Sequence, residues 1–175
     1  MKKIIQKLSI VLFASLSMNV SAAEPLAEIK NFRILSTQFA NAGMPTPEEF
    51  KLIHQQGYQH IINLIPGDFS HEQQQVTSLG MSFEQIAVDW HQPTLENFQQ
   101  FVKLMQQYQK EKVLVHCQLN YRASAFSYLY QVTQLGVSTK LANNQMITVW
   151  QPEGTWLEFI DMVEQHYKKD NKLSS

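Results

Sequence analysis

The most informative stretch of the chain is KVLVHCQLNYRAS, residues 112–124. Its first five residues contain the apolar run 113–115 and predict a buried parallel strand, and residues 122–135 are expected to form a helix that Gly136 closes. A loop between such a strand and a helix directs backbone N–H groups and the positive end of the helix toward one point. That point favours a bound anion and an ionised thiol, and Cys117 stands at the start of the loop.

Cys117 and Arg122 are scarce residue types in this chain. Cys117 is the only cysteine, and Arg122 is one of two arginines, the other being Arg33. Arginine can hold a phosphate or a carboxylate through two parallel hydrogen bonds, and a thiolate beside an anion site is the minimum arrangement for cysteine-dependent group transfer. Taken alone, Cys117 would be interpreted as a buried structural cysteine. The presence of His116, Arg122 and Ser124 around the same loop favours a functional thiol instead.

Strands and helices alternate along the rest of the chain. Further strands are predicted at residues 60–65 and 83–88. Capping signals and apolar periodicity predict helices that begin near Thr46, Ser70, Thr94, Arg122 and Thr155. The alternation predicts an α/β fold with a central, largely parallel sheet flanked by helices.

The first 22 residues resemble an export signal. A basic start is followed by a short, interrupted apolar run and then by the small residues Ser21, Ala22 and Ala23, which is the pattern of a cleaved secretory signal peptide. The apolar run is too short to span a bilayer comfortably, which argues against a membrane anchor. We therefore expect a signal peptide at residues 1–22, a single domain at residues 23–175, and a periplasmic or secreted location without stable membrane insertion.

Composition excludes several classes of function. The chain has 175 residues, with 14 basic and 15 acidic side chains, and loss of residues 1–22 would leave 11 basic and 15 acidic ones. A net negative chain has no general attraction to nucleic acid, so no nucleic-acid partner is expected. A single cysteine excludes an intrachain disulfide or a multi-cysteine metal site. The six histidines have no close ligand spacing, so neither a metal nor another cofactor is predicted.

The loop sequence resembles that of the cysteine-dependent protein tyrosine and dual-specificity phosphatases, whose loop reads His-Cys, five residues, then Arg-Ser/Thr. Residues 42–50, the helix that ends at Gly57 and the strand at residues 61–65 are similar to a bacterial branch of these domains. That branch was formerly of unknown function and also occurs fused to a metallo-β-lactamase-like hydrolase. The resemblance covers about residues 30–165. It implies a dual-specificity-phosphatase-like fold and hydrolysis of a phosphate ester, or binding of another small oxyanion.

The resemblance also implies roles for individual residues. Cys117 would attack phosphorus and form a phosphocysteine, and Asp89 would be the general acid, because it lies 28 residues upstream, just after a predicted strand. His91 is the substitute candidate for the acid. Ser124 would assist departure of the thiolate. The substrate phosphate would be held by the loop and the start of the helix, at Gln118, Leu119, Asn120, Tyr121, Arg122 and Ser124.

The loop departs from the phosphatase pattern, because only four residues separate Cys117 from Arg122. In one alignment a residue is deleted and Arg122 still binds the anion. In the other, Asn120 occupies the usual glycine position, which asparagine tolerates because it enters the left-handed region, and Ala123 stands where arginine is expected. Rhodanese-type sulfurtransferases resemble this spacing more closely, so transfer of a persulfide sulfur is an alternative. A module that binds an anion without turnover is a third interpretation.

Overall fold

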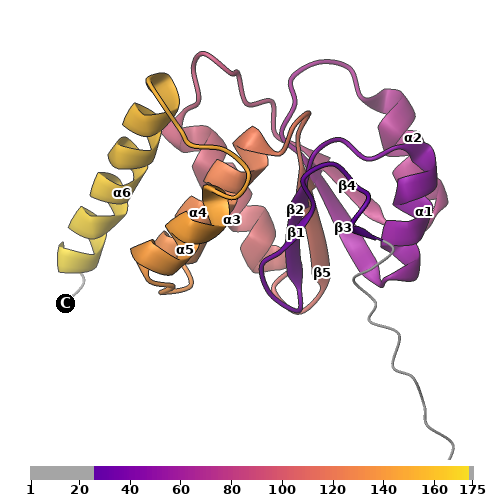
Figure 1. Cartoon of the computed structure of the whole chain (residues 1–175), viewed down its shortest axis with the longest axis horizontal. Coiled ribbons are helices and arrows are strands. Elements are labelled where there is room, and N and C mark those ends of the chain that lie inside the picture. Colours follow the sequence, from indigo (N-terminus) through magenta and orange to yellow (C-terminus); the bar gives the residue numbers. More distant parts are fainter. Residues whose placement is uncertain (1–25, 174–175) are drawn as a thin grey trace, which may run out of the picture.

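A five-stranded sheet with the strand order β1-β2-β5-β3-β4 forms the centre of the protein (Figure 1). The computed structural model describes residues 26–173, so the expected signal peptide lies outside the described residues. Only β1 runs antiparallel to its neighbour, and every other pair of strands is parallel. The strands are β1 (Arg33–Ile34), β2 (Phe39–Ala42), β3 (Tyr58–Asn63), β4 (Ser82–Gln85) and β5 (Lys112–His116).

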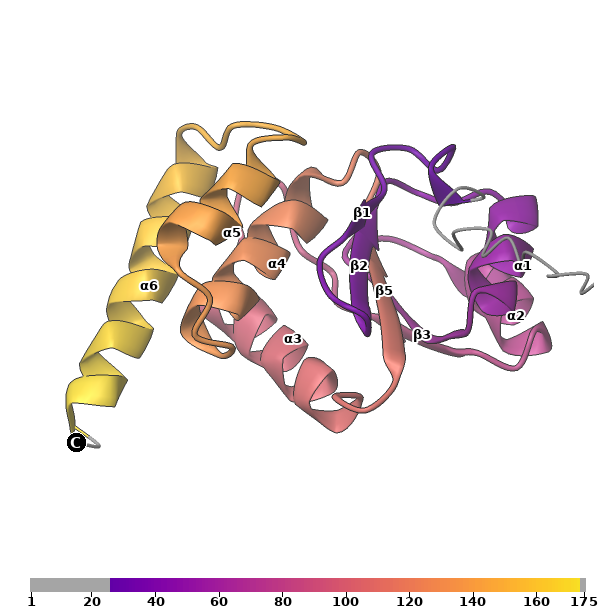
Figure 2. The ribbon, with the colours of Figure 1, turned by 60° about the horizontal axis from the view of Figure 1, so that its bottom comes forward.

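Six helices cover the two faces of this sheet (Figure 2). Helices α1 and α2 lie on one side, and α3, α4, α5 and α6 lie on the other. The predicted α/β fold with a largely parallel, helix-flanked sheet is therefore confirmed. The helices are α1 (Pro47–Gln55), α2 (Ser70–Ser78), α3 (Leu95–Gln107), α4 (Tyr121–Thr133), α5 (Thr139–Met146) and α6 (Thr155–Leu173).

Strand β5 lies in the middle of the sheet and contributes to two separate cores. Val113, Val115 and Cys117 belong to the core beneath α3, α4 and α6, whereas Leu114 belongs to the core beneath α1 and α2. The period of two along a strand sends successive side chains to opposite faces, and both faces here are apolar. This explains why residues 113–115, between Lys112 and His116, form an uninterrupted apolar run.

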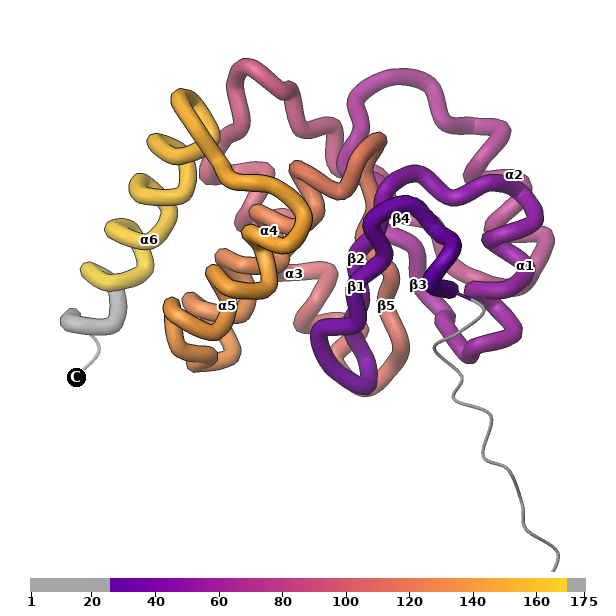
Figure 3. The backbone as a smooth tube through the Cα atoms, in the orientation of Figure 1, coloured from indigo at the N-terminus to yellow at the C-terminus, as the bar shows by residue number. Residues whose placement is uncertain are grey.

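The parallel arrangement brings functional loops to one edge of the sheet. The tube in Figure 3 shows the chain leaving β3, β4 and β5 at the same end. Ligands bind at the carboxyl ends of the strands in open α/β sheets, so this edge is where a site is expected. Within residues 26–173, no helix is long and apolar enough to cross a membrane.

Three local outcomes bear on the sequence predictions. The capping box at Thr46 and Glu49 is present, with reciprocal hydrogen bonds of 3.3 and 2.7 Å. Strand β4 ends at Gln85, not at residue 88, because its partner β3 ends at Asn63 and residues beyond Ile86 have no strand to pair with. Helix α5 was not predicted.

Candidate active site

The Cys117 side chain lies at the carboxyl end of β5, at the wall of a pocket of about 310 Å³. Only 1% of the cysteine is exposed. The loop consists of residues 117–120, because β5 ends at His116 and α4 begins at Tyr121. The structure therefore gathers five of the predicted site residues together with one tryptophan: the pocket is lined by Trp90, Cys117, Gln118, Leu119, Tyr121 and Arg122.

The carbonyl groups of the loop point away from the pocket. The Met44 N–H donates to the Gln118 carbonyl at 3.3 Å, and the Asn31 side chain donates to the Leu119 carbonyl at 3.0 Å. Neither donor lines the pocket. In a trans peptide group the N–H points opposite to the C=O, so the N–H groups of Leu119 and Asn120 are directed away from Met44 and Asn31. An antiparallel bridge between Gly43 and Leu119 further joins this loop to the residue after β2.

The start of α4 adds more N–H donors. Asn120 precedes the helix with φ of 70°, in the left-handed region, and its side chain does not cap the helix. The Ser124 N–H is the first to find an intrahelical acceptor, the Asn120 carbonyl, at 2.9 Å. The N–H groups of Tyr121, Arg122 and Ala123 therefore have no acceptor within the helix. An uncapped first turn of this kind is a favourable place for an anion.

Arg122 joins the loop to the segment that follows β4. Its Nε donates to the Val88 carbonyl at 2.9 Å, and its guanidinium carbon lies 5.4 Å from the centroid of the Trp90 ring. Among residues 26–173, its two terminal nitrogens have no hydrogen-bond acceptor. Arg122 lines the same pocket as Cys117, so these nitrogens are available to an anion there. Arg33, by contrast, uses all three nitrogens on the Phe32 carbonyl and on Thr148.

Asp89 lies on the segment that Arg122 holds, but its carboxylate does not line the pocket. The side chain is exposed and accepts a hydrogen bond of 2.7 Å from the His91 N–H. His91 is also exposed and outside the pocket lining. The neighbours of Asp89, Val88 and Trp90, both contact the guanidinium. The segment is thus at the site, while the candidate acid faces outward.

Ser124 does not line the pocket either. Its hydroxyl donates to the Tyr121 carbonyl and accepts from the Trp150 indole N–H, both at 3.0 Å. The Trp150 ring stacks on Tyr121 with 4.9 Å between centroids, and it lies 5.5 Å from the Trp90 ring. These contacts make Ser124 a support for the aromatic wall of the pocket. The role predicted for its hydroxyl in thiolate departure stays a prediction.

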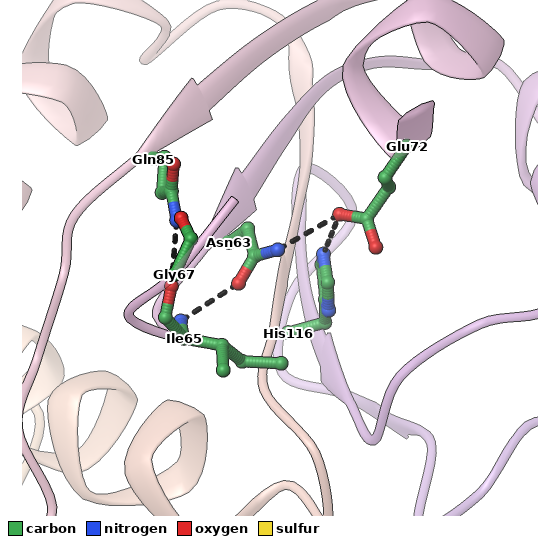
Figure 4. A network of polar contacts seen from close by, with 6 residues as sticks. All are labelled: Asn63, Ile65, Gly67, Glu72, Gln85 and His116. Atoms are coloured by element: carbon green, nitrogen blue, oxygen red, sulfur yellow. Dashed lines mark hydrogen bonds and ion pairs between the residues drawn. The ribbon is translucent and has the colours of Figure 1, made fainter. Parts of the chain in front are cut away.

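A buried polar network lies behind Cys117, on the other face of the sheet (Figure 4). The His116 Nε2 lies 2.9 Å from Glu72 Oε1, and the same oxygen accepts from the Asn63 side chain at 2.9 Å. Asn63 in turn accepts from the Ile65 N–H at 2.7 Å. His116 is fully buried, and its Nδ1 has no partner among the described residues. Glu72 was missed by the sequence analysis, because nothing in a glutamine-rich helix distinguishes one glutamate as buried.

Potential metal ligands are dispersed. Among residues 26–173, no three His, Cys, Asp or Glu side chains lie together as they would around a metal ion.

A parallel sheet of this topology, with a cysteine loop between its central strand and a helix, places the protein in the class with the protein tyrosine and dual-specificity phosphatase fold. The catalytic domain of the PP-IP phosphatase SIW14 from S. cerevisiae superimposes with a TM-score of 0.67 at 16% identity, over 82% of this chain and 94% of that chain. P. aeruginosa TpbA, in complex with pTyr, superimposes with a TM-score of 0.64 at 13% identity, over 79% and 90% of the two chains. At these identities the likeness establishes the fold.

A more similar structure identifies the family. A candidate phosphatase (DUF442) from Shewanella putrefaciens CN-32 is 34% identical and superimposes with a TM-score of 0.75, over 83% of this chain and 98% of that chain. The chain therefore belongs to the DUF442 family of phosphatase-like proteins, which confirms the resemblance to the bacterial branch. A scan of protein-family models found no match, and a search of curated proteins found none either.

Proposed function

We propose that the protein hydrolyses a phosphomonoester through a phosphocysteine formed at Cys117. The observation that carries this proposal is that Cys117, the only cysteine of the sequence, and Arg122, whose terminal nitrogens have no acceptor among residues 26–173, line one pocket at the uncapped start of α4. Negative charge that builds up on the equatorial oxygens of phosphorus would meet these donors, which is where stabilisation accelerates the reaction most.

The proposed reaction has two balanced steps. In the first, the Cys117 thiolate attacks phosphorus, an S–P bond forms, and the P–O bond to the leaving group breaks as Asp89 gives its proton to the departing oxygen. In the second, water attacks phosphorus and gives a proton to the Asp89 carboxylate. The S–P bond then breaks, and inorganic phosphate and the thiolate are released. Asp89 must leave its bond to the His91 N–H to act in this way.

A second function is favoured by one specific observation, the four-residue spacing between Cys117 and Arg122. A smaller loop suits a persulfide sulfur, so sulfur transfer is the competing proposal. A module that only binds an anion is the third possibility, and it is an outcome of the same test.

The deciding experiment compares two assays on the purified protein and on Cys117→Ser. We expect phosphate release from an aryl phosphate, its loss in the variant, and a phosphorylated Cys117 in a rapid quench. Thiocyanate formed from thiosulfate and cyanide, with a mass gain of one sulfur on Cys117, would replace the phosphatase by a sulfurtransferase. Inactivity in both assays with retained phosphate binding would leave a binding module.

Export is a separate proposal. We infer it from the signal-like pattern of residues 1–22, a basic start followed by a short apolar run and small residues. The N-terminal residue of the protein isolated from cells tests this, since an intact Met1 would contradict cleavage.

A further inference from the structure

Three asparagines, of which Asn41 and Asn120 are buried and Asn31 is half-buried, form a network behind the cysteine loop. The side-chain N–H groups of Asn120 donate to the Asn31 carbonyl and to Asn41 Oδ1, both at 2.7 Å. Asn31 also contacts the loop as a donor: its side-chain N–H group donates to the Leu119 carbonyl at 3.0 Å. Residues 119 and 120 are therefore held by a reciprocal pair of hydrogen bonds to one residue that lies 88 and 89 positions earlier in the chain.

The network continues through β2 and returns to the helix behind the loop. Asn41 lies on β2 and donates to the Ser127 hydroxyl at 2.9 Å, and Ser127 donates to the Ala123 carbonyl at 2.6 Å. Asn41, Asn120 and Ser127 are all buried. Buried hydrogen bonds resist rearrangement, because breaking one leaves a polar group without water to replace its partner. The loop is thus tied on one side to β2 and on the other to the first turn of α4.

The orientation of the Asn120 amide is determined by its partners. Both groups that contact its nitrogen are acceptors, so a flipped amide would place oxygen against oxygen at two positions. Its own Oδ1 is buried without a partner among the described residues, and the two strong bonds on the nitrogen offset this. Glycine could adopt the same left-handed backbone conformation, but it could make neither bond. Asparagine at this position therefore does more than permit the turn.

We propose that Asn120, held by Asn31 and Asn41, is a positioning residue that fixes the backbone of the cysteine loop in the conformation that binds the oxyanion. This inference rests on the proposed function, since it assigns the network a purpose in anion binding. The contacts with the loop are direct: the Asn31 side chain holds the Leu119 carbonyl, the Asn120 side chain holds the Asn31 carbonyl, and an antiparallel bridge between Gly43 and Leu119 joins the loop to the residue after β2. The network sets the backbone conformation of the loop before any anion arrives.

The test compares Asn120→Gly with the unchanged protein and with Tyr128→Phe. Glycine keeps the backbone conformation and removes only the side-chain bonds. Tyr128→Phe removes a partly buried hydrogen bond from the same helix, to Glu164, and this bond does not involve the loop, so the variant controls for general loss of stability. We expect Asn120→Gly to weaken binding of inorganic phosphate about tenfold, as two lost hydrogen bonds suggest, and Tyr128→Phe to leave it unchanged.

Amide hydrogen exchange supplies a readout that needs no ligand. The N–H groups of Met44 and Ser124 donate to the carbonyls of Gln118 and Asn120, so their exchange reports the position of the loop. We expect both to exchange faster in Asn120→Gly and not in Tyr128→Phe. If Asn120→Gly does not fold, Ser127→Ala removes only the last link and should show the same changes more weakly.

The outcomes separate the two proposals. Unchanged phosphate affinity together with unchanged exchange at Met44 and Ser124 would overturn the positioning role. Equal weakening of phosphate binding in Tyr128→Phe would also overturn it, because the effect would then be one of stability. If the unchanged protein neither binds phosphate nor hydrolyses an aryl phosphate, the proposed function fails, and the exchange rates still decide whether the network holds the loop.

Discussion

At the scale of single residues, Arg122 combines two tasks, since its Nε holds the Val88 carbonyl while the side chain lines the pocket with two terminal nitrogens that have no acceptor among residues 26–173. Lysine has one compact charge and cannot do both. We expect Arg122→Lys to lower kcat/KM roughly 100-fold, the scale of losing one transition-state donor. Arg33→Lys is the matched control, because Arg33 lies outside the pocket, and it should leave kcat/KM nearly unchanged. Equal losses in the two variants would contradict a role for Arg122 in the site.

The role of Asp89 is tested by the leaving group. A general acid matters most when the departing oxygen is strongly basic, so Asp89→Asn should slow hydrolysis of phenyl phosphate roughly 100-fold and that of p-nitrophenyl phosphate much less. Steady-state rates with the two esters measure the difference. If both esters slow equally, Asp89 is not the acid. If the difference instead appears in His91→Gln, the assignment moves to His91.

The sequence alone pointed to candidate site residues that lie close together along the chain. It missed the residues that contact the site from distant positions in the sequence. Cys117 and Arg122 were found because a strand, a loop and a helix start follow one another within 13 residues. Glu72 contacts His116 across 44 positions, and Asn41 contacts Asn120 across 79. No periodicity or spacing in one sequence encodes such pairs, so the supports of the site could only be seen in the structure.

At the scale of elements, the cap of α1 offers a clean stability measurement. The Thr46 hydroxyl accepts from the Glu49 N–H, and the Glu49 carboxylate accepts from the Thr46 N–H. Thr46→Ala should lower the free energy of unfolding in urea by about 1 kcal/mol, the usual effect of losing such a cap. Glu49→Gln is the matched control, because glutamine can still accept the reciprocal bond, and it should have a smaller effect. A larger loss for the control would mean that charge, rather than capping, stabilises this end.

The helices and strands differ in how well the sequence predicts them. Strand β5 occurs over the predicted residues 112–116, because a central parallel strand is apolar on both faces. Helix α5 was missed because only Ala142 and Met146 are buried in it, too few for a periodic pattern. Its one available signal was Ser138, whose side chain accepts from the Leu141 N–H as a helix cap.

At the scale of the whole molecule, buried tyrosines predict how stability depends on pH. Burial raises the pKa of Tyr58 from near 10 to about 12, and burial also raises the pKa values of Tyr108, Tyr128 and Tyr130. Between pH 10 and 12 the unfolded chain has lost these protons while the folded protein still holds them. The unfolded state then binds fewer protons, so the free energy of unfolding falls as pH rises through this range.

Urea denaturation at pH 8, 10 and 11 measures this slope. We expect the midpoint to fall above pH 10, and Tyr58→Phe to make the fall shallower. At pH 8, Tyr58 is protonated in both the folded and the unfolded protein, so the difference in urea midpoint between the variant and the unchanged protein contains no contribution from ionisation of Tyr58. That difference is the baseline for the comparison at pH 10 and 11. A slope that Tyr58→Phe leaves intact would assign the alkaline loss of stability to the other three tyrosines.

The two arginines differ in how their nitrogens are used, and this makes them distinguishable to a dicarbonyl reagent. Arg33 has a protein partner for each nitrogen, whereas the terminal nitrogens of Arg122 have none among residues 26–173. Phenylglyoxal should therefore modify Arg122 first, and peptide mapping would need to follow only two sites. Added inorganic phosphate should shield Arg122 and leave Arg33 unaffected. Because the sequence has only two arginines, protection of one of them from the reagent would locate the candidate anion site directly.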